Sequence, residues 1–145
     1  MPNMTATPID TCGLPWMPLG AGIFARFLRL VGDERSLQLK VMPGTVIGKH
    51  AHSGSVNAYG ISGARRLEDG SIAGPGSYVF EPAGNVDSWA CEGDEPCVVQ
   101  ISMAGALVYL ADDGSQISRT DTTSLRTAYR EWYRREGHPA VAIGT

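Results

Sequence analysis

Turn residues divide this chain into short segments, and their spacing constrains the fold more than any other feature of the sequence. The 145 residues include 18 glycines and nine prolines. These residues cluster in the middle of the chain, for example at Pro43-Gly44, Gly74-Pro75-Gly76 and Pro82-Ala83-Gly84. Helices tolerate such clusters poorly, whereas tight turns between strands require them. We therefore predict that the body of the protein is β-structure.

The segments between these turns have the length and pattern of strands. In residues 37–41, three apolar side chains alternate with two polar ones, as in a half-buried strand. Further short apolar runs cover residues 46–52, 56–61, 65–68, 78–81, 86–91, 98–103 and 106–110. Many short strands of this kind predict an all-β antiparallel barrel or jelly roll, which closes on itself and leaves few strand edges exposed.

The two ends of the chain differ from this pattern. Residues 17–30 fit an edge strand or an arm. Near the C-terminus, apolar residues recur at helical spacing, and they are Leu125, Ala128, Tyr129, Trp132 and Tyr133. Thr123 or Ser124 is placed to cap this helix, and Gly137 to end it. We expect a single domain with an arm and edge strand in 1–34, a barrel in 35–120 and an amphipathic helix in 121–137.

Composition narrows the range of partners. The net charge is −3 and the pI is about 5.5, without the long basic run typical of proteins that bind nucleic acid or anionic membranes. The sequence shows neither an apolar stretch of membrane-spanning length nor a secretory signal pattern, which predicts a cytoplasmic protein. Three cysteines without metal-binding spacing are expected to be free thiols. A small-molecule partner is the remaining expectation.

Two histidines one residue apart, His50 and His52, form the strongest functional signal. Residues two apart on a strand point to the same face, so both imidazoles could reach one metal ion. A later strand or turn that brings Asp87 to this face would complete a site of two histidines and one carboxylate, which suits iron(II) with open coordination positions. Alternatively, the histidines merely line the barrel or its surface, and Asp87 bonds its own turn.

The spacing of these residues resembles the two motifs of the cupin superfamily: Gly44-x5-His50-x-His52 with Gly63, then Gly76-x5-Pro82-x-Gly84-x2-Asp87. Segments 50–54, 74–84 and 105–110 are similar to the group of acetylacetone-cleaving and 2,4′-dihydroxyacetophenone dioxygenases, over roughly residues 35–137. The resemblance implies a small jelly-roll barrel that holds iron(II), or else zinc or nickel. It also implies cleavage by O2 of a carbon–carbon bond in a β-diketone or hydroxyaryl ketone.

The chain departs from the group at two positions. The third histidine ligand of the group falls on Asp87, and a position that the group fills with glutamate or histidine falls on Asn57. An aspartate keeps a ligand but adds a negative charge to the metal. The change leaves open a second interpretation, a zinc-type sensor or storage cupin without turnover, and a third, a metal-dependent isomerase or decarboxylase.

Four further residues are expected near the site. Asn57 could bond a ligand-bound water or Asp87, or line the pocket. Glu81 could face the pocket or form a salt bridge with Arg65 or Arg66. Tyr59 and Trp89 could wall an apolar pocket, although barrel interiors are normally filled by such residues. The expected partners are a carbonyl substrate and O2, and exposed strand edges together with the aromatic helix favour a homodimer or homotetramer.

Overall fold

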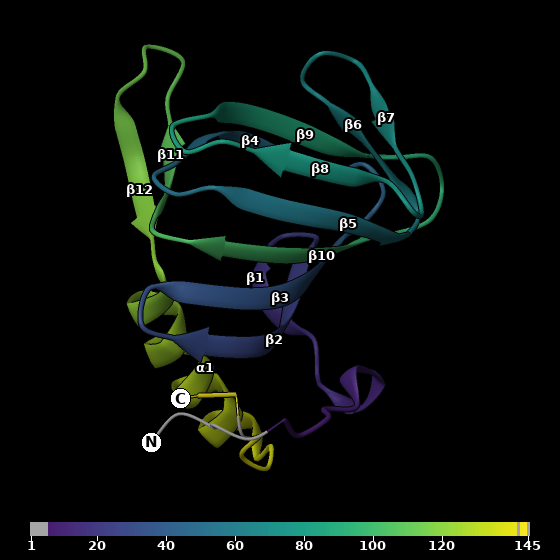
Figure 1. Cartoon of the computed structure of the whole chain (residues 1–145). Helices are drawn as coiled ribbons and strands as arrows, with labels where there is room; N and C mark the ends of the chain where they lie inside the picture. Colours follow the sequence, from purple (N-terminus) through teal and green to yellow (C-terminus); the bar gives the residue numbers. More distant parts are fainter. Residues whose placement is uncertain (1–5, 142, 145) are drawn as a thin grey trace.

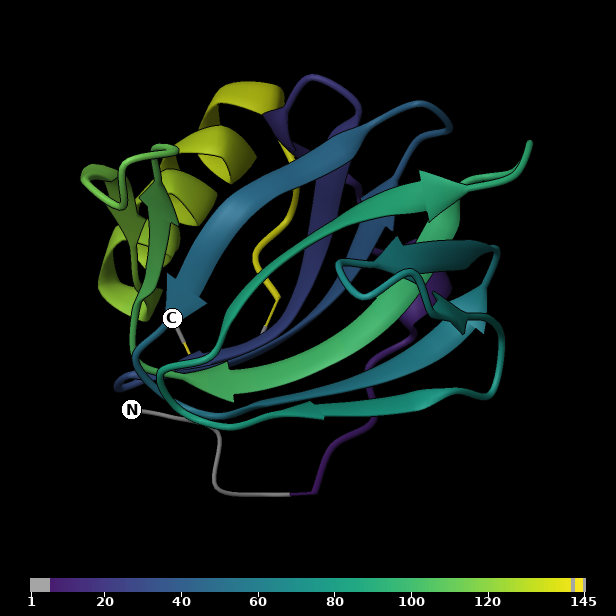
Figure 2. The same cartoon turned by 90° about the horizontal axis from the view of Figure 1, so that it is seen from above.

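The computed structural model describes residues 6–141, 143 and 144 of the chain. Within them, strands form two antiparallel six-stranded sheets that curve and face each other (Figures 1 and 2). The first sheet has the order β1 (Met17–Gly20), β2 (Ile23–Val31), β3 (Glu34–Val41), β10 (Cys97–Ala104), β5 (Val56–Ser62) and β8 (Tyr78–Glu81). The second has the order β12 (Gln116–Thr120), β11 (Leu107–Leu110), β4 (Val46–His52), β9 (Val86–Glu92), β6 (Ala64–Leu67) and β7 (Ile72–Ala73). This arrangement confirms the predicted all-β jelly roll.

The chain crosses repeatedly between the two sheets, and glycine makes one of these crossings possible. β5 belongs to the first sheet and β6 to the second, with Gly63 alone between them. Gly63 has a φ of 62°, and a Cβ there would lie 2.1 Å from the carbonyl oxygen of Pro96. Both the left-handed backbone and this close approach require a residue without a side chain. The motif glycine at position 63 is thus a corner of the barrel.

The N-terminal region contributes more to the sheet than an arm does. β1 lies at the edge of the first sheet, while β2 is an interior strand that pairs with β1 and β3. At one edge of the second sheet, β12 pairs with β11 although its residues are almost all exposed. Strand β12 was not predicted, because an exposed strand lacks the apolar alternation that indicates one.

The single α-helix of the described residues, α1, spans Thr122–Glu136. Its N-cap is Asp121, whose carboxylate accepts a hydrogen bond from the backbone N–H of Ser124, so the prediction of Thr123 or Ser124 as the cap is wrong. Asp121 keeps the extended backbone that a cap needs, and Ser124 completes a capping box by accepting from the Asp121 N–H. Gly137 ends the helix in a left-handed conformation, as predicted. No helix in the described part of the chain has the length and apolar character needed to span a bilayer.

Buried apolar residues form two cores. The helix-side core joins α1 to strands β1 to β3 and contains Met17, Ala25, Phe27, Leu30, Leu37, Tyr129, Tyr133 and Ile143. The inter-sheet core contains Val41, Ile47, Ala58, Trp89, Cys91, Cys97 and Val99. Leu39 and Ile101 pack against both. The two cores therefore form one continuous interior, of which the inter-sheet part borders the predicted histidine site.

Candidate metal centre

A bulge in β4 turns both histidines into the barrel. Ile47 pairs with Trp89 and His50 pairs with Asp87, so three residue steps on β4 match two on β9. This extra residue changes the alternation, and Ile47, His50 and His52 all lie inside, with 4%, 2% and 4% of their surfaces exposed. The two imidazoles consequently share one interior face, as the sequence predicted.

A backbone carbonyl fixes the orientation of His50. Its Nδ1 lies 2.7 Å from the carbonyl oxygen of Gly48, within the bulge. A carbonyl oxygen can only accept a hydrogen bond, so Nδ1 donates and carries the ring proton. The lone pair of the neutral imidazole is then on Nε2, where it is free to bind a metal.

His52 is a buried imidazole without any hydrogen bond. Neither of its ring nitrogens has a partner among the described residues. Burial is the main cause that lowers the pKa of His52 to about 4, and the charges of His50 and Arg35 lower it further, while Asp87 opposes them. The ring is therefore neutral at neutral pH. Buried polar nitrogens are normally satisfied, so this side chain fits a site that could hold a metal.

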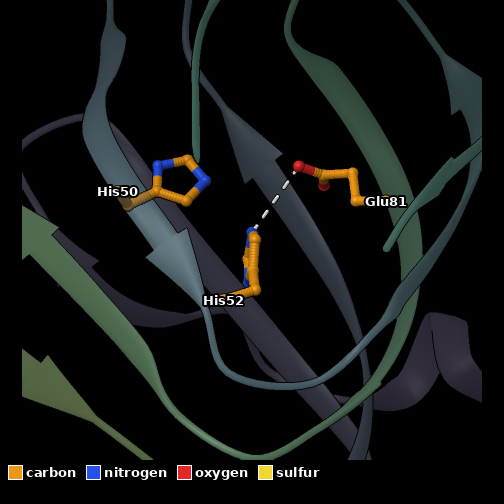
Figure 3. A group of neighbouring side chains, drawn as sticks. All are labelled: His50, His52 and Glu81. Atoms are coloured by element: carbon orange, nitrogen blue, oxygen red, sulfur yellow. Dashed lines mark ion pairs between the residues drawn. The ribbon is translucent and has the colours of Figure 1, made fainter. Parts of the chain in front are cut away.

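The opposite sheet supplies a carboxylate to the same place. Glu81, at the end of β8, is 7% exposed, and one ligand atom each of His50, His52 and Glu81 lies within 4.8 Å of the others (Figure 3). Glu81 Oε1 is 3.8 Å from His52 Nε2 and accepts a hydrogen bond from Asn85 at 2.9 Å. Because His52 is neutral, this contact is not an ion pair at neutral pH. Two imidazoles and one carboxylate suit iron(II) or zinc, so these three buried residues could hold a metal.

Of the two positions expected for Glu81, the structure shows the one that faces the pocket, and not the salt bridge with Arg65 or Arg66. Arg66 pairs instead with Glu92 at 2.8 Å, and Arg65 forms no salt bridge within the described residues. A signal for the inward orientation was present in the sequence, because Val79 and Glu81 are two residues apart on one strand and share a face.

Asp87 faces the histidines from the neighbouring strand. It pairs with His50 across β4 and β9, and Tyr109 of β11 pairs with His50 on the other side, so the three side chains form a row on one face. Burial raises the pKa of Asp87, and the charge of Glu81 raises it further. Its carboxylate does not belong to the group formed by the histidines and Glu81. Metal ligation by Asp87 therefore stays a prediction.

Asn57 and Tyr59 lie away from the metal centre, and here the structure differs from the expectation. Both are exposed on the outer face of β5, and Tyr59 is 51% exposed. Asn57 accepts a hydrogen bond from the hydroxyl of Tyr78, also on this outer face. Val56 and Ala58 occupy the inner positions of β5, which forces the residues between and after them outward.

A cavity of about 280 Å³ opens beside the histidines. Its wall is mainly apolar and includes Ile47, Trp89, Ile101, Met103 and Leu107. The charged and imidazole side chains in the wall are Arg35, His50, His52, Arg65 and Glu81. A small cavity that combines an apolar wall with a few convergent polar groups is typical of a site for a small molecule.

A jelly roll with this paired-histidine site between its sheets defines the protein as a cupin. The description of the family profile that matches residues 5–104, over half of the chain, is "ChrR Cupin-like domain". The chain belongs to this ChrR cupin-like family. The comparison with curated proteins gave no match.

Solved structures agree with this assignment. An RmlC-like cupin protein from Ralstonia eutropha JMP134 is 22% identical, with a TM-score of 0.89, and the match covers 97% of this chain and 95% of that one. An acetylacetone dioxygenase from Acinetobacter johnsonii is 17% identical, with a TM-score of 0.74 and coverage of 90% and 94%. The complex of Rhodobacter sphaeroides SigE with the anti-sigma ChrR matches at 22% identity and a TM-score of 0.55, over 60% of this chain and 46% of that one. These likenesses confirm the cupin fold, with acetylacetone dioxygenases among its structural neighbours.

Proposed function

We propose that this cupin is an iron(II)-dependent dioxygenase that cleaves a carbon–carbon bond of a β-diketone or a hydroxyaryl ketone. The observation that carries the proposal is the convergence of His50, His52 and Glu81 beside an apolar cavity, with both nitrogens of His52 lacking a partner. The structural likeness to an acetylacetone dioxygenase supports the choice of reaction.

In this proposal the residues of the chain bind the metal, orient its ligands and keep water away from the substrate. His50, His52 and Glu81 bind the metal, and Asp87 is proposed as a further ligand. Iron(II), when bound, supplies Lewis acidity toward a substrate enolate and the redox chemistry of O2. The carbonyl oxygen of Gly48 keeps His50 in the tautomer that leaves the lone pair of Nε2 available to the metal. Trp89, Met103 and their apolar neighbours keep water from the reacting carbon. Both atoms of O2 end in the two products and the substrate supplies the electrons, so no other reductant is required.

The test is oxygen uptake after anaerobic reconstitution of the protein with iron(II). The substrates are a panel of β-diketones and hydroxyaryl ketones, and His50→Ala serves as the control. We expect uptake with at least one member of the panel in the wild type and none above background in the variant. Absence of uptake with every member would contradict the proposed reaction.

A second candidate is a metal-binding cupin that senses or stores zinc without turnover. The match to the ChrR cupin-like family favours it, because a solved relative of that name is described as an anti-sigma factor. The metal found in the purified protein separates the two candidates. Iron that reacts with O2 supports catalysis, whereas tightly held zinc that survives dialysis against a chelator supports a sensor.

We further propose that the chain forms a homodimer or homotetramer. β8 is an edge strand, and the outer face that it shares with β5 exposes Tyr59, Tyr78 and Phe80, each by more than half. Sedimentation equilibrium tests this, with Phe80→Glu expected to weaken association.

A further inference from the structure

The most unusual charged group in the cavity wall is Arg65. Its residue is 4% exposed, yet its guanidinium donates no hydrogen bond and forms no ion pair within 4.0 Å in the described part of the chain. The guanidinium carbon lies 4.9 Å from the centre of the Trp89 ring. Burial lowers the pKa of Arg65, but an arginine stays protonated in a protein. Because Arg65 lines the cavity and has no protein partner there among the described residues, its donors are available to an anion that enters the cavity.

Arg35 provides an internal comparison. It lines the same cavity and is 3% exposed, but its Nη1 donates to the carbonyl oxygen of Gly105 at 2.8 Å and to the hydroxyl of Thr122 at 3.0 Å. These bonds tie β3 to the start of α1. Arg35 thus has a structural partner, whereas the fold leaves the donors of Arg65 free.

The other charged groups near Arg65 do not neutralise it. The group that acts on it most strongly is Cys97, but burial raises the pKa of this thiol to about 11, so it is neutral at neutral pH. Glu81 and Asp87 also act on Arg65, though neither comes within ion-pair distance. Glu81 faces the histidines, and a divalent ion held there offsets the two carboxylates. The cavity then keeps the excess positive charge of Arg65.

We infer that Arg65 binds a carboxylate of the substrate, so the substrate is a small 2,4-dioxo acid with a short apolar tail rather than a neutral diketone. This inference rests on the proposed function. The two oxygens of the enolised 1,3-dicarbonyl unit bind the metal, and the carboxylate at the end of that unit meets the planar donors of the guanidinium. The Trp89 ring packs against the guanidinium, whose in-plane donors are left for the carboxylate, and the apolar wall receives the tail.

The experiment compares two probes that differ only in the carboxylate, 2,4-dioxopentanoate and 2,4-pentanedione. Calorimetric titration of the zinc-loaded protein under argon measures their affinities without turnover, and Trp89 fluorescence gives a second readout. The wild type is expected to prefer the carboxylate probe by about 10- to 100-fold, the range for hydrogen bonds to charged groups. Arg65→Gln should remove this preference while leaving the affinity for 2,4-pentanedione and the zinc content unchanged.

Two further variants guard against indirect effects. Arg66→Gln is the matched control, because Arg66 is the next residue of β6 but is exposed and paired with Glu92. It should keep the full preference. Arg65→Lys keeps the charge but loses the planar pair of donors, so it should retain only part of the preference. Thermal melts confirm that each variant folds.

The outcomes separate this inference from the proposed function. Equal affinity of the wild type for the two probes, or a preference that survives in Arg65→Gln, would overturn the carboxylate site even if oxygen uptake occurs. If the protein binds no metal, the same titration is run on metal-free protein. A preference there that depends on Arg65 would uphold the carboxylate site and overturn the proposed function, and the lack of one would overturn both.

Discussion

Aliphatic and aromatic side chains fill the space between α1 and strands β2 and β3, whereas imidazoles and charged side chains border the cavity between the two sheets. In the helix-side core, Phe27 and Leu30 are at most 1% exposed, and the rings of Phe27 and Tyr129 meet edge to face at 5.9 Å. In the cavity wall, His52 and Arg65 are each 4% exposed; both ring nitrogens of His52 lack a hydrogen-bond partner in the described chain, and Arg65 faces the cavity without an ion pair. The two regions lie side by side and share apolar side chains, but the cavity wall adds buried imidazoles and charged groups to them.

The helix-side core therefore mainly stabilises the fold, whereas the cavity wall mainly binds a ligand. Close apolar packing stabilises the folded state by itself, so the helix-side core needs nothing from outside the chain. Buried nitrogens without partners destabilise the folded state until a metal or an anion binds them. We therefore expect substitutions in the first region to change stability at constant ligand affinity, and substitutions in the second to do the reverse.

The largest expected effect on stability is that of Leu30→Ala. Leu30 is fully buried in the helix-side core and does not line the cavity. Loss of its side chain leaves a void in a packed interior, which should lower the free energy of unfolding by about 2–5 kcal/mol. Urea denaturation checks this value, and metal titration of the folded variant should give the wild-type affinity. A weakened metal affinity in the folded variant would break the separation between the two regions.

The next effect concerns the two carboxylates of the metal centre. Glu81→Gln should lower metal affinity by more than about 100-fold, the upper end of what loss of an outer partner of a metal ligand costs. Asp87→Asn should lower it by a similar factor if Asp87 is the further ligand proposed above, and by about 10-fold if Asp87 acts only through its charge. Competition with a chelating dye measures both affinities. An equal or larger loss in Asp87→Asn would show that Asp87 is itself a ligand, as the sequence motif predicted.

The sequence predicted the barrel well because its turns carry local signals. Gly63 and Gly84 have the positive φ angles that glycine adopts readily, and both stood out as turn residues. The pair His50 and His52 was likewise predictable, since both lie on one short strand. The role of Glu81 was not, because its meeting with the histidines depends on how the edge of the first sheet closes over β4. The bulge at Gly48 and Lys49 has no signal in the alternation of β4, although it decides that Ile47 shares the interior face.

The acid sensitivity of the metal-free protein should depend on His52. The pKa of His52 is about 4 in the folded protein and about 6.5 in an unfolded chain. Between these two pH values the unfolded state binds a proton that the folded state does not bind. The free energy of unfolding should therefore fall by about 3 kcal/mol from this group as the pH drops from above 6.5 to about 4. Urea denaturation at several pH values in the presence of a chelator measures this fall. In His52→Gln the fall in the free energy of unfolding should be about 3 kcal/mol smaller. Parallel pH profiles of the wild type and the variant would contradict the prediction.

The smallest expected effect comes from the polar atom of the helix-side core that resembles His52 in its burial. The hydroxyl of Tyr129 is buried without a well-formed hydrogen bond among the described residues, and burial raises its pKa, as does the adjacent hydroxyl of Tyr133. Tyr129→Phe removes this hydroxyl and keeps the ring contacts with Phe27 and Tyr133, so stability should stay the same or rise by up to about 1 kcal/mol. Metal affinity should not change. Thermal melts and metal titration measure both. A loss of stability in Tyr129→Phe would contradict this prediction and would show that the hydroxyl has a partner, such as a buried water.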